Sequence, residues 1–394
     1  MISLQEAKEL VLAQAHSFGK EQVQLDDAAG RVLSQSIVAD RDYPPFNRAT
    51  MDGIAINMTD WENGIRSFAV AEIIYAGGIS TKNLNVGECY KIMTGSSVPS
   101  GANAVIRIED TKEQKNRLSI TVSEVSSFQN IALKGKDIKQ QSSIINEPVV
   151  CTPSIITVLA SLGYHEVVVE KLPSIAIITT GDEVVNINEQ VNEVQIRNSN
   201  AHLLKALLGK WKIKPTACIH VKDDAAALSE AIKKYQSNDI LILSGAVSAG
   251  DADFVPEVLM NAGAKKIFHK VAIRPGKPIW FGQFENGATV FALPGNPFST
   301  LATFKLFIES FLYACFGVNQ PSAITLPIDN NRLKKSNLDE FFPVTITSNP
   351  AVAVPLNFNT SGDITAALYA DALALQPVEK MELIKGEVVS CILL

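Results

Sequence analysis

Four short, predominantly apolar runs constrain the fold of this chain more than any other sequence feature. They occupy residues 175–179, 218–221, 240–243 and 290–293. Stretches with helical spacing separate or follow them, at residues 200–211, 224–236, 254–262 and 297–316. Apolar strands that alternate with helices are typical of βαβ units, in which helices cover both faces of a parallel sheet. We therefore predict an α/β domain at residues 173–319, with its ligand site at the carboxyl ends of the strands.

The rest of the chain has a different pattern on each side of this domain. Residues 45–139 contain short β-branched runs broken by glycine turns, which predicts an inserted β module. Residues 3–17 and 151–163 have helical spacing, so residues 1–44 and 140–172 are predicted to form one discontinuous helical linker domain. Residues 320–394 are rich in β-formers and predict a barrel-like C-terminal β domain. The predicted fold class is multidomain α/β plus β.

Length, charge and cysteine usage limit the class of protein. A chain of 394 residues is too long for one ordinary core. Its net charge of −6 gives no general attraction for nucleic acid or an anionic membrane. Its five cysteines are scattered, which argues against a disulfide framework and against a structural zinc site. No apolar run is long enough to span a bilayer. We expect a cytoplasmic protein without nucleic-acid or membrane partners.

Two acidic segments directly follow predicted strands. Thr180 and Gly181 lead to the adjacent carboxylates of Asp182 and Glu183. The segment 244–253 combines small residues, which let backbone N–H groups approach an anion, with Asp251 and Asp253. Carboxylates beside bound phosphate usually hold a divalent cation such as Mg²⁺. Either segment alone is more often an ordinary turn, but together they predict a phosphate and metal site.

Two further segments at the same predicted edge supply positive charge. Arg274 and Lys277 lie on a loop that contains two prolines. In segment 293–297, Asn296 suits a helix N-cap and Pro297 the first helical position, so free N–H groups would face the edge.

A separate loop, far from these segments in sequence, presents Asp52 after a Pro-Pro pair. The alternative interpretation of this loop is a turn at a domain boundary without a functional role.

Five motifs occur in a fixed order: P-P-F-x-x-x-x-M-D-G at 44–53, T-G-D-E at 180–183, S-G-x-V-S-x-G-x-x-D at 244–253, R-P-G-K-P at 274–278 and L-P-G-N-P at 293–297. In these motifs, and along nearly its whole length, the chain resembles the molybdopterin molybdenumtransferases. That family includes the C-terminal portion of the scaffold protein gephyrin. The resemblance implies an enzyme that inserts molybdate into adenylylated molybdopterin, hydrolyses the phosphoanhydride and releases AMP, with Mg²⁺ or a similar divalent cation.

The resemblance also implies partners and residue roles. It implies a homodimer with its site between subunits, a molybdopterin adenylyltransferase upstream, and molybdoenzymes or cofactor carriers downstream. The implied catalytic residues are Asp52, Asp182, Glu183 and Asp253, and the implied metal ligands are Asp251, Asp253 and Glu183. The implied substrate-binding residues are Thr180, Gly181, Ser244, Gly245, Ser248, Gly250, Arg274, Gly276, Lys277, Pro294, Gly295, Asn296, Pro297 and Ser361.

Several positions depart from the family pattern. Ala246 replaces a glycine, Ile54 a tyrosine and Pro343 an arginine, and an Asp-Ser-Asn step reads Asn-Ser-Asn at 198–200. Two alternatives therefore stay open: a molybdopterin adenylyltransferase, and a catalytically decayed paralogue that binds the pterin. The sequence does not distinguish molybdate from tungstate as the preferred oxyanion.

Overall fold

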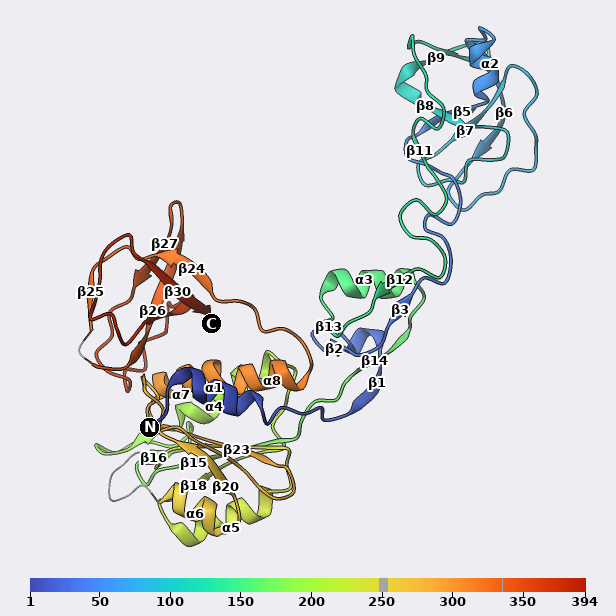
Figure 1. Cartoon of the computed structure of the whole chain (residues 1–394). Helices are drawn as coiled ribbons and strands as arrows, with labels where there is room; N and C mark the ends of the chain where they lie inside the picture. The colour runs from blue at the N-terminus through green and yellow to red at the C-terminus, as the bar shows by residue number, and fades with distance from the viewer. Residues whose placement is uncertain (248–253, 335) are drawn as a thin grey trace. The chain divides into compact units, whose positions relative to one another are not determined.

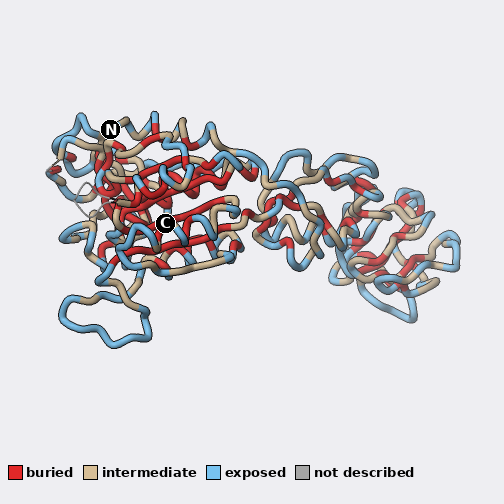
Figure 2. Tube along the Cα trace, turned by 90° about the horizontal axis from the view of Figure 1, so that it is seen from below, coloured by how far each residue is buried: buried red, intermediate tan, exposed pale blue. Residues whose placement is uncertain are grey.

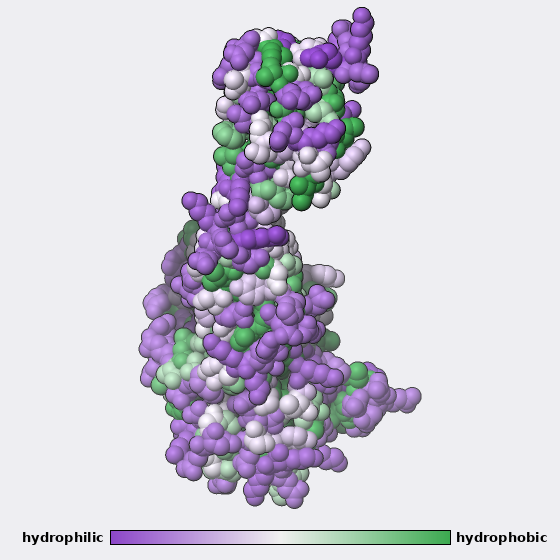
Figure 3. Space-filling view, turned by 90° about the vertical axis from the view of Figure 1, so that its right-hand side faces the viewer, coloured by the Kyte–Doolittle hydropathy of each residue, from purple (hydrophilic) through white to green (hydrophobic). Residues whose placement is uncertain are grey.

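The computed structural model describes residues 1–247, 254–334 and 336–394, which form two compact units (Figure 1). Unit 1 comprises Met1–Ser34, Pro148–Ile155 and Glu166–Leu394, and unit 2 comprises Gln35–Glu147 and Ile156–His165. Within the described residues, no helix is both long and apolar enough to cross a membrane. On the face shown in Figure 3, hydrophilic side chains predominate and apolar ones are scattered, as is usual for exposed surface.

A six-stranded sheet organises the α/β part of unit 1. Its strands, in spatial order, are β18 (Ala217–Val221), β15 (Ile175–Thr180), β19 (Ile240–Ser244), β23 (Thr289–Leu293), β22 (Trp280–Gln283) and β20 (Lys265–His269). The first four run parallel, as predicted. Strand β22 pairs antiparallel with β23, and β20 pairs antiparallel with β22; these two strands were not predicted from the sequence. The connection between β22 and β23 is too short for a crossover, so those strands must form a hairpin.

Helices cover both faces of this sheet, and each face has its own core (Figures 1 and 2). One face packs against α5 (Ala225–Tyr235) and α6 (Val255–Asn261). The other packs against α1 (Leu4–Leu12), α4 (Ser199–Gly209) and a helix that begins at Pro297. The side chains of β15 alternate between the two cores, since Ile177 belongs to one and Ile178 to the other. This double burial explains the predominantly apolar runs in the sequence.

The helix predicted at 297–316 has three parts. It comprises α7 (Pro297–Thr303), a π-helical turn η3 (Phe304–Ile308) and α8 (Glu309–Cys315). The π turn carries Lys305, which is only 6% exposed. Apolar periodicity predicted the helix correctly but cannot reveal a local change of hydrogen-bond pattern.

The linker segments contain more sheet than the helical prediction. Helices α1 and α3 (Pro153–Ser161) lie near the predicted positions, and Ser3 caps α1 by accepting from the Glu6 N–H at 3.1 Å. In the same segments, β1 (Lys20–Gln24), β14 (Glu166–Glu170), β2 (Val32–Leu33) and β13 (Val149–Val150) form one sheet. Strands of two to five residues leave too little alternation to be recognised in sequence.

Two further large sheets lie in unit 2 and in the C-terminal part of unit 1, beside four two-stranded sheets among the described residues. In unit 2 the order is β8 (Ala104–Arg107), β5 (Gly53–Ile56), β7 (Glu88–Ile92), β6 (Ser67–Ile74), β10 (Arg117–Ile120) and β9 (Thr111–Gln114). The C-terminal sheet joins β21 (Ile273–Arg274), β26 (Asp339–Ser348), β28 (Ala372–Gln376), β30 (Val388–Leu393) and β24 (Ile324–Pro327), with β27 (Ala351–Pro355) on β26. Because β21 belongs to this sheet, the predicted cationic segment with Arg274 and Lys277 lies beside the C-terminal strands. The partition into four domains stays a prediction.

Candidate functional site

Two adjoining cavities lie at the carboxyl ends of β15, β19 and β23, the edge that the sequence predicted. The first has a volume of about 630 Å³ and the second about 550 Å³. Ala246, Gly295 and Asn296 line both cavities. The predicted residues Thr180, Gly181, Glu183, Ser244, Gly245 and Pro297 line the first. The predicted residues Arg274, Gly276, Lys277, Pro294 and Ser361 line the second. Segments far apart in sequence therefore meet here.

Asn200, at the start of α4, connects the strand ends in the first cavity. Its Nδ2 donates to Ser244 Oγ at 3.0 Å and to the Gly295 carbonyl at 2.6 Å. Its Oδ1 is buried, and among the described residues it has no hydrogen-bond partner. A buried acceptor without a partner costs free energy, which a ligand that donates a hydrogen bond would recover.

The first cavity also carries carboxylates. Glu183 and Asp223 line it, whereas Asp182 lines a neighbouring cavity and accepts a hydrogen bond from the Asp223 N–H at 3.2 Å. Burial raises the pKa of Asp223, and the nearby charges of Asp182 and Glu183 raise it further. This concentration of negative charge favours binding of a cation.

The second cavity has a cationic side. Arg274 is the last residue of β21 and Lys277 lies on the loop after it; both are exposed, and among the described residues neither forms an ion pair. Gly276 lies between them at φ +105°, and a Cβ there would lie 2.5 Å from Thr303 Cγ2. The opposite side comes from the C-terminal sheet and its loops, through Glu340 and Phe358. Unpaired cations of this kind suit an oxyanion.

Asn296 occupies the N-cap position of α7, with Pro297 at the first turn, as predicted. Its side chain, however, does not cap the helix. Asn296 Nδ2 instead donates to Ser361 Oγ at 2.8 Å, and the Phe298 N–H donates to the Ser361 carbonyl at 3.2 Å. These bonds hold the C-terminal segment around Ser361 at the boundary between the two cavities.

The loop after β19 approaches β15 closely. Gly245 has φ +117°, and a Cβ there would lie 2.6 Å from the Thr180 carbonyl oxygen, so only glycine fits. The next residue, Ala246, has φ +46°, a left-handed conformation that glycine adopts at lower cost. The chain therefore keeps a glycine-like backbone at Ala246 while placing a methyl group between the two cavities.

Residues 2–163 match the family described as the MoeA N-terminal region (domain I and II), and residues 176–314 match a probable molybdopterin binding domain. A molybdopterin molybdenumtransferase of Staphylococcus aureus (strain Mu50) is 33% identical over 95% of this chain and 91% of the relative. A molybdopterin molybdenumtransferase of Staphylococcus epidermidis (strain RP62A) is 32% identical over 100% of this chain and 95% of the relative. The chain belongs to the molybdopterin molybdenumtransferase family. A solved molybdopterin biosynthesis moeA protein from Pyrococcus horikoshii OT3 is 27% identical, with a TM-score of 0.85 and full coverage of both chains.

Asp52, a predicted catalytic residue of this molybdopterin molybdenumtransferase-family chain, lies in unit 2. Its Oδ1 accepts hydrogen bonds from both the N–H and the Oγ1 of Thr94 at 2.7 Å. These bonds lower the pKa of the Asp52 carboxyl from its ordinary value, because they favour its ionised form. Gly53, the next residue, allows a close approach to β8, because a Cβ there would lie 1.8 Å from the Ile106 carbonyl oxygen.

Four predicted residues, Ser248, Gly250, Asp251 and Asp253, lie outside the described residues. Within the described part of the chain, no three His, Cys, Asp or Glu side chains form a ready metal site. Asn200, Arg197 and Phe358 also line the cavities, although they were not among the predicted site residues. The Asn-Ser-Asn step pointed to Asn200. No sequence signal pointed to Phe358, because its place depends on packing of the C-terminal loop.

Proposed function

We propose that this chain is a molybdopterin molybdenumtransferase, which inserts molybdate into adenylylated molybdopterin, hydrolyses the phosphoanhydride and releases AMP. The near-full-length similarity to relatives of that name carries the proposal. The paired cavities support it, since one has carboxylates with a hydrogen-bond acceptor and the other has unpaired cations. Phosphoanhydride chemistry needs charge neutralisation and alignment rather than a covalent nucleophile.

The first cavity suits the pterin and its phosphates. A pterin carries an exocyclic amine and ring N–H groups, and Asn200 Oδ1 is an acceptor without a partner among the described residues. The small residues Gly245 and Gly295 allow a phosphate to approach the backbone. In the second cavity, Arg274 and Lys277 would hold molybdate or a phosphate through charge-assisted hydrogen bonds.

Mg²⁺ is part of the proposal. Glu183 and Asp223 provide two carboxylates at the first cavity, and Asp251 and Asp253 follow β19 in sequence. Mg²⁺ retains several waters and needs only one or two protein carboxylates when phosphates complete its shell. When bound, it would neutralise phosphate charge. The protein residues would position the ligands around it.

The proposed localisation, oligomeric state and partner enzymes rest on the same family resemblance. We infer a cytoplasmic homodimer that receives adenylylated molybdopterin from a molybdopterin adenylyltransferase. Its product would pass to molybdoenzymes or cofactor carriers. The adenylyltransferase alternative is not favoured, because the full-length relatives are named for the insertion reaction.

AMP release from adenylylated molybdopterin and Mg²⁺, measured with and without molybdate, tests the proposal. We expect molybdate-dependent release by the unchanged protein and loss of at least about a hundredfold in rate for Asp253→Ala. Asp329→Ala removes another acidic side chain, whose partner is Lys385 at 3.0 Å, and serves as the control with unchanged rate. Binding of the nucleotide without any AMP release would reject the insertion reaction and favour the decayed paralogue.

A further inference from the structure

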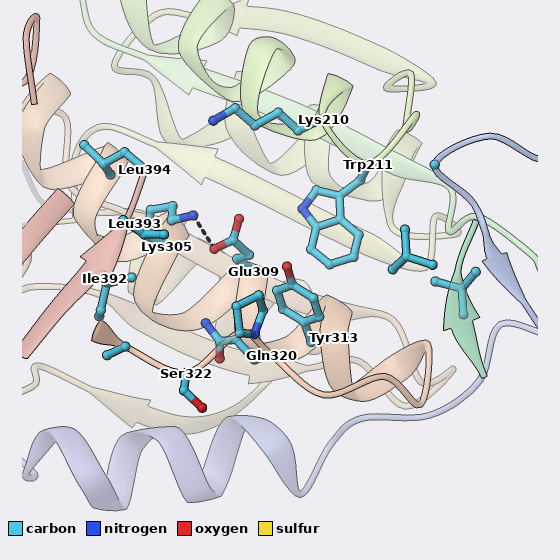
Figure 4. Close-up of a pocket in the computed structure, with 15 residues that line it drawn as sticks. Lys210, Trp211, Lys305, Glu309, Tyr313, Gln320, Ser322, Ile392, Leu393 and Leu394 are labelled. Atoms are coloured by element: carbon cyan, nitrogen blue, oxygen red, sulfur yellow. Dashed lines mark ion pairs between the residues drawn. The ribbon is translucent and has the colours of Figure 1, made fainter. Parts of the chain in front are cut away.

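A separate cavity of about 300 Å³ lies in unit 1, and no described residue lines both it and the first or second cavity. Its floor is an ion pair between Lys305 Nζ and Glu309 Oε2 at 2.5 Å (Figure 4). The two residues are only 6% and 8% exposed. Lys305 belongs to the π turn η3, and Glu309 is the first residue of α8.

A buried ion pair of this kind is weak evidence for a stabilising role. Burying two charges costs desolvation energy, and an apolar pair of similar size often serves the fold equally well. An ammonium group has three N–H donors, and Glu309 is the one side-chain partner that the described residues give Lys305. Lys305 therefore has donors left for a ligand. The π turn that carries it is a rare feature that occurs frequently at functional sites.

The walls of the cavity add aromatic surface and further donors. Trp211 and Tyr313 meet edge to face, with ring centroids 4.6 Å apart. Figure 4 shows the nitrogen-bearing edge of Trp211 and the Tyr313 hydroxyl turned toward the ion pair. Burial, and then the charge of Glu309, raise the pKa of Tyr313, so its hydroxyl stays a neutral donor.

Two lysines and one carboxylate are the charged side chains among the lining residues. Lys210 is exposed at the rim, and its charge is added to the balanced pair of Lys305 and Glu309. Gln320, also exposed, contributes an amide. On the side formed by the linker sheet, Val32 and Val150 provide apolar surface. The cavity thus combines a cationic end with an aromatic and apolar body.

We propose that this cavity is a second small-molecule site, which binds a planar ring bearing one acid group. The carboxylate or phosphate would bind Lys305 and Lys210, and the ring would contact Trp211 and Tyr313. The volume limits the ligand to one or two rings, since it is at the lower end for small-molecule sites.

The elements around this cavity also reach the first cavity. Helix α4 has Ser199 and Asn200 in the first cavity, and Lys210 and Trp211 directly follow its C-terminal end. The helical run from Pro297 to Cys315 likewise begins at the first cavity and carries Lys305 and Tyr313 further along. A bound acid would therefore contact the same helices that position Asn200 and Asn296.

Calorimetric titration of the full chain with 2-naphthoate, 2-naphthyl phosphate and uncharged 2-naphthamide tests the proposal. We expect saturable binding of at least one acid with a Kd below about 1 mM, and binding of the amide at least about tenfold weaker. The double variant Lys305→Met/Glu309→Leu removes both buried charges together, so neither is left unpaired. It is expected to weaken acid binding at least about tenfold.

The matched control is Lys265→Met/Glu285→Leu, which removes an exposed pair, 3.4 Å apart, that does not line the cavity. It should bind as the unchanged protein does. The proposal is overturned if neither acid saturates up to about 10 mM. It is also overturned if the Lys305→Met/Glu309→Leu variant, checked for folding by its thermal unfolding, binds both acids with unchanged affinity. The assay uses neither molybdopterin nor molybdate, so its outcome is independent of the proposed insertion reaction.

Discussion

At the residue scale, the backbone of β8 leaves no room for a side chain at Gly53. An added Cβ would lie 1.8 Å from the Ile106 carbonyl oxygen on β8. We expect Gly53→Ala to lower the free energy of unfolding of unit 2 by roughly 3 kcal/mol, because a backbone atom must move. Scanning calorimetry of the variant and the unchanged protein measures this loss of unfolding free energy. Gly64→Ala is the control: Gly64 has φ +87° with open space around it, so only about 1 kcal/mol of backbone strain is expected. Equal losses in both variants would contradict the steric argument.

Lys277 allows a second prediction at this scale, on substrate binding. Its exposed ammonium lines the second cavity, so Lys277→Ala should raise the KM for molybdate about tenfold. The change in kcat should be smaller, since Glu183 and Asp223 stay in place. Steady-state AMP release at varied molybdate concentration measures both constants. The control is Lys265→Ala, which removes an exposed lysine outside this cavity. A normal KM with a reduced kcat would show that Lys277 does not bind the oxyanion.

The residue types in the sequence predicted which charged and polar groups line the cavities better than they predicted which of those residues contact one another. Arg274, Lys277 and Asn296 were recognised from charge and helix-start preferences, and they line the cavities. The bond from Asn296 to Ser361 was not foreseen, because these residues are brought together only when the C-terminal segment folds back. The left-handed backbone of Ala246 was equally hidden, since alanine gives no local sign of it.

At the scale of elements, Asp371 connects two strands of the C-terminal sheet and gives a pH-dependent prediction. Directly before β28, its Oδ2 accepts from the Ile346 N–H and from Thr345 Oγ1 of β26, both at 2.7 Å. These bonds lower its pKa from the ordinary value of 3.8. A lowered folded-state pKa stabilises the fold above pH 3.8, and the contribution is lost as the pH falls through the folded value.

We therefore expect Asp371→Asn to lower the melting temperature at pH 7, where the carboxylate is charged. The difference from the unchanged protein should shrink as the pH falls below 3.8 and the wild-type carboxylate gains its proton. Thermal unfolding followed by circular dichroism at several pH values measures it. A difference that stays constant down to pH 3 would mean that the charge of Asp371 is not what matters.

Elements with a long periodic pattern were predictable from the sequence. Strands β15, β18, β19 and β23 begin and end within one residue of the predicted runs. The shorter strands were not predictable from the sequence. For example, β2 and β13 have only two residues each, which is too few for a hydrophobic period. The π turn at 304–308 was also beyond prediction, since its apolar spacing continues that of the flanking helix.

At the scale of the whole molecule, the proposed homodimer makes a prediction about Asp52. Asp52 lies in unit 2 and Glu183 in unit 1, and the family resemblance implies that the site uses residues of two subunits. Asp52→Asn and Glu183→Gln should each abolish AMP release when the variant is assayed alone. After the two variants are mixed, unfolded and refolded together, half of the dimers would contain one chain of each kind. One of the two sites in such a dimer would then have both wild-type residues, giving about a quarter of the normal rate.

If Asp52 instead serves a site in its own chain, each chain in the mixture lacks one essential group and no activity returns. Refolded wild-type protein sets the full rate, and each variant refolded alone sets the background. Sedimentation equilibrium on the same samples shows whether the mass is twice the monomer value of 42.6 kDa. Recovery near a quarter in a dimeric sample would establish a shared site. A dimer without recovery would confine Asp52 to its own chain, and a monomer with full wild-type activity would remove the need for a partner subunit.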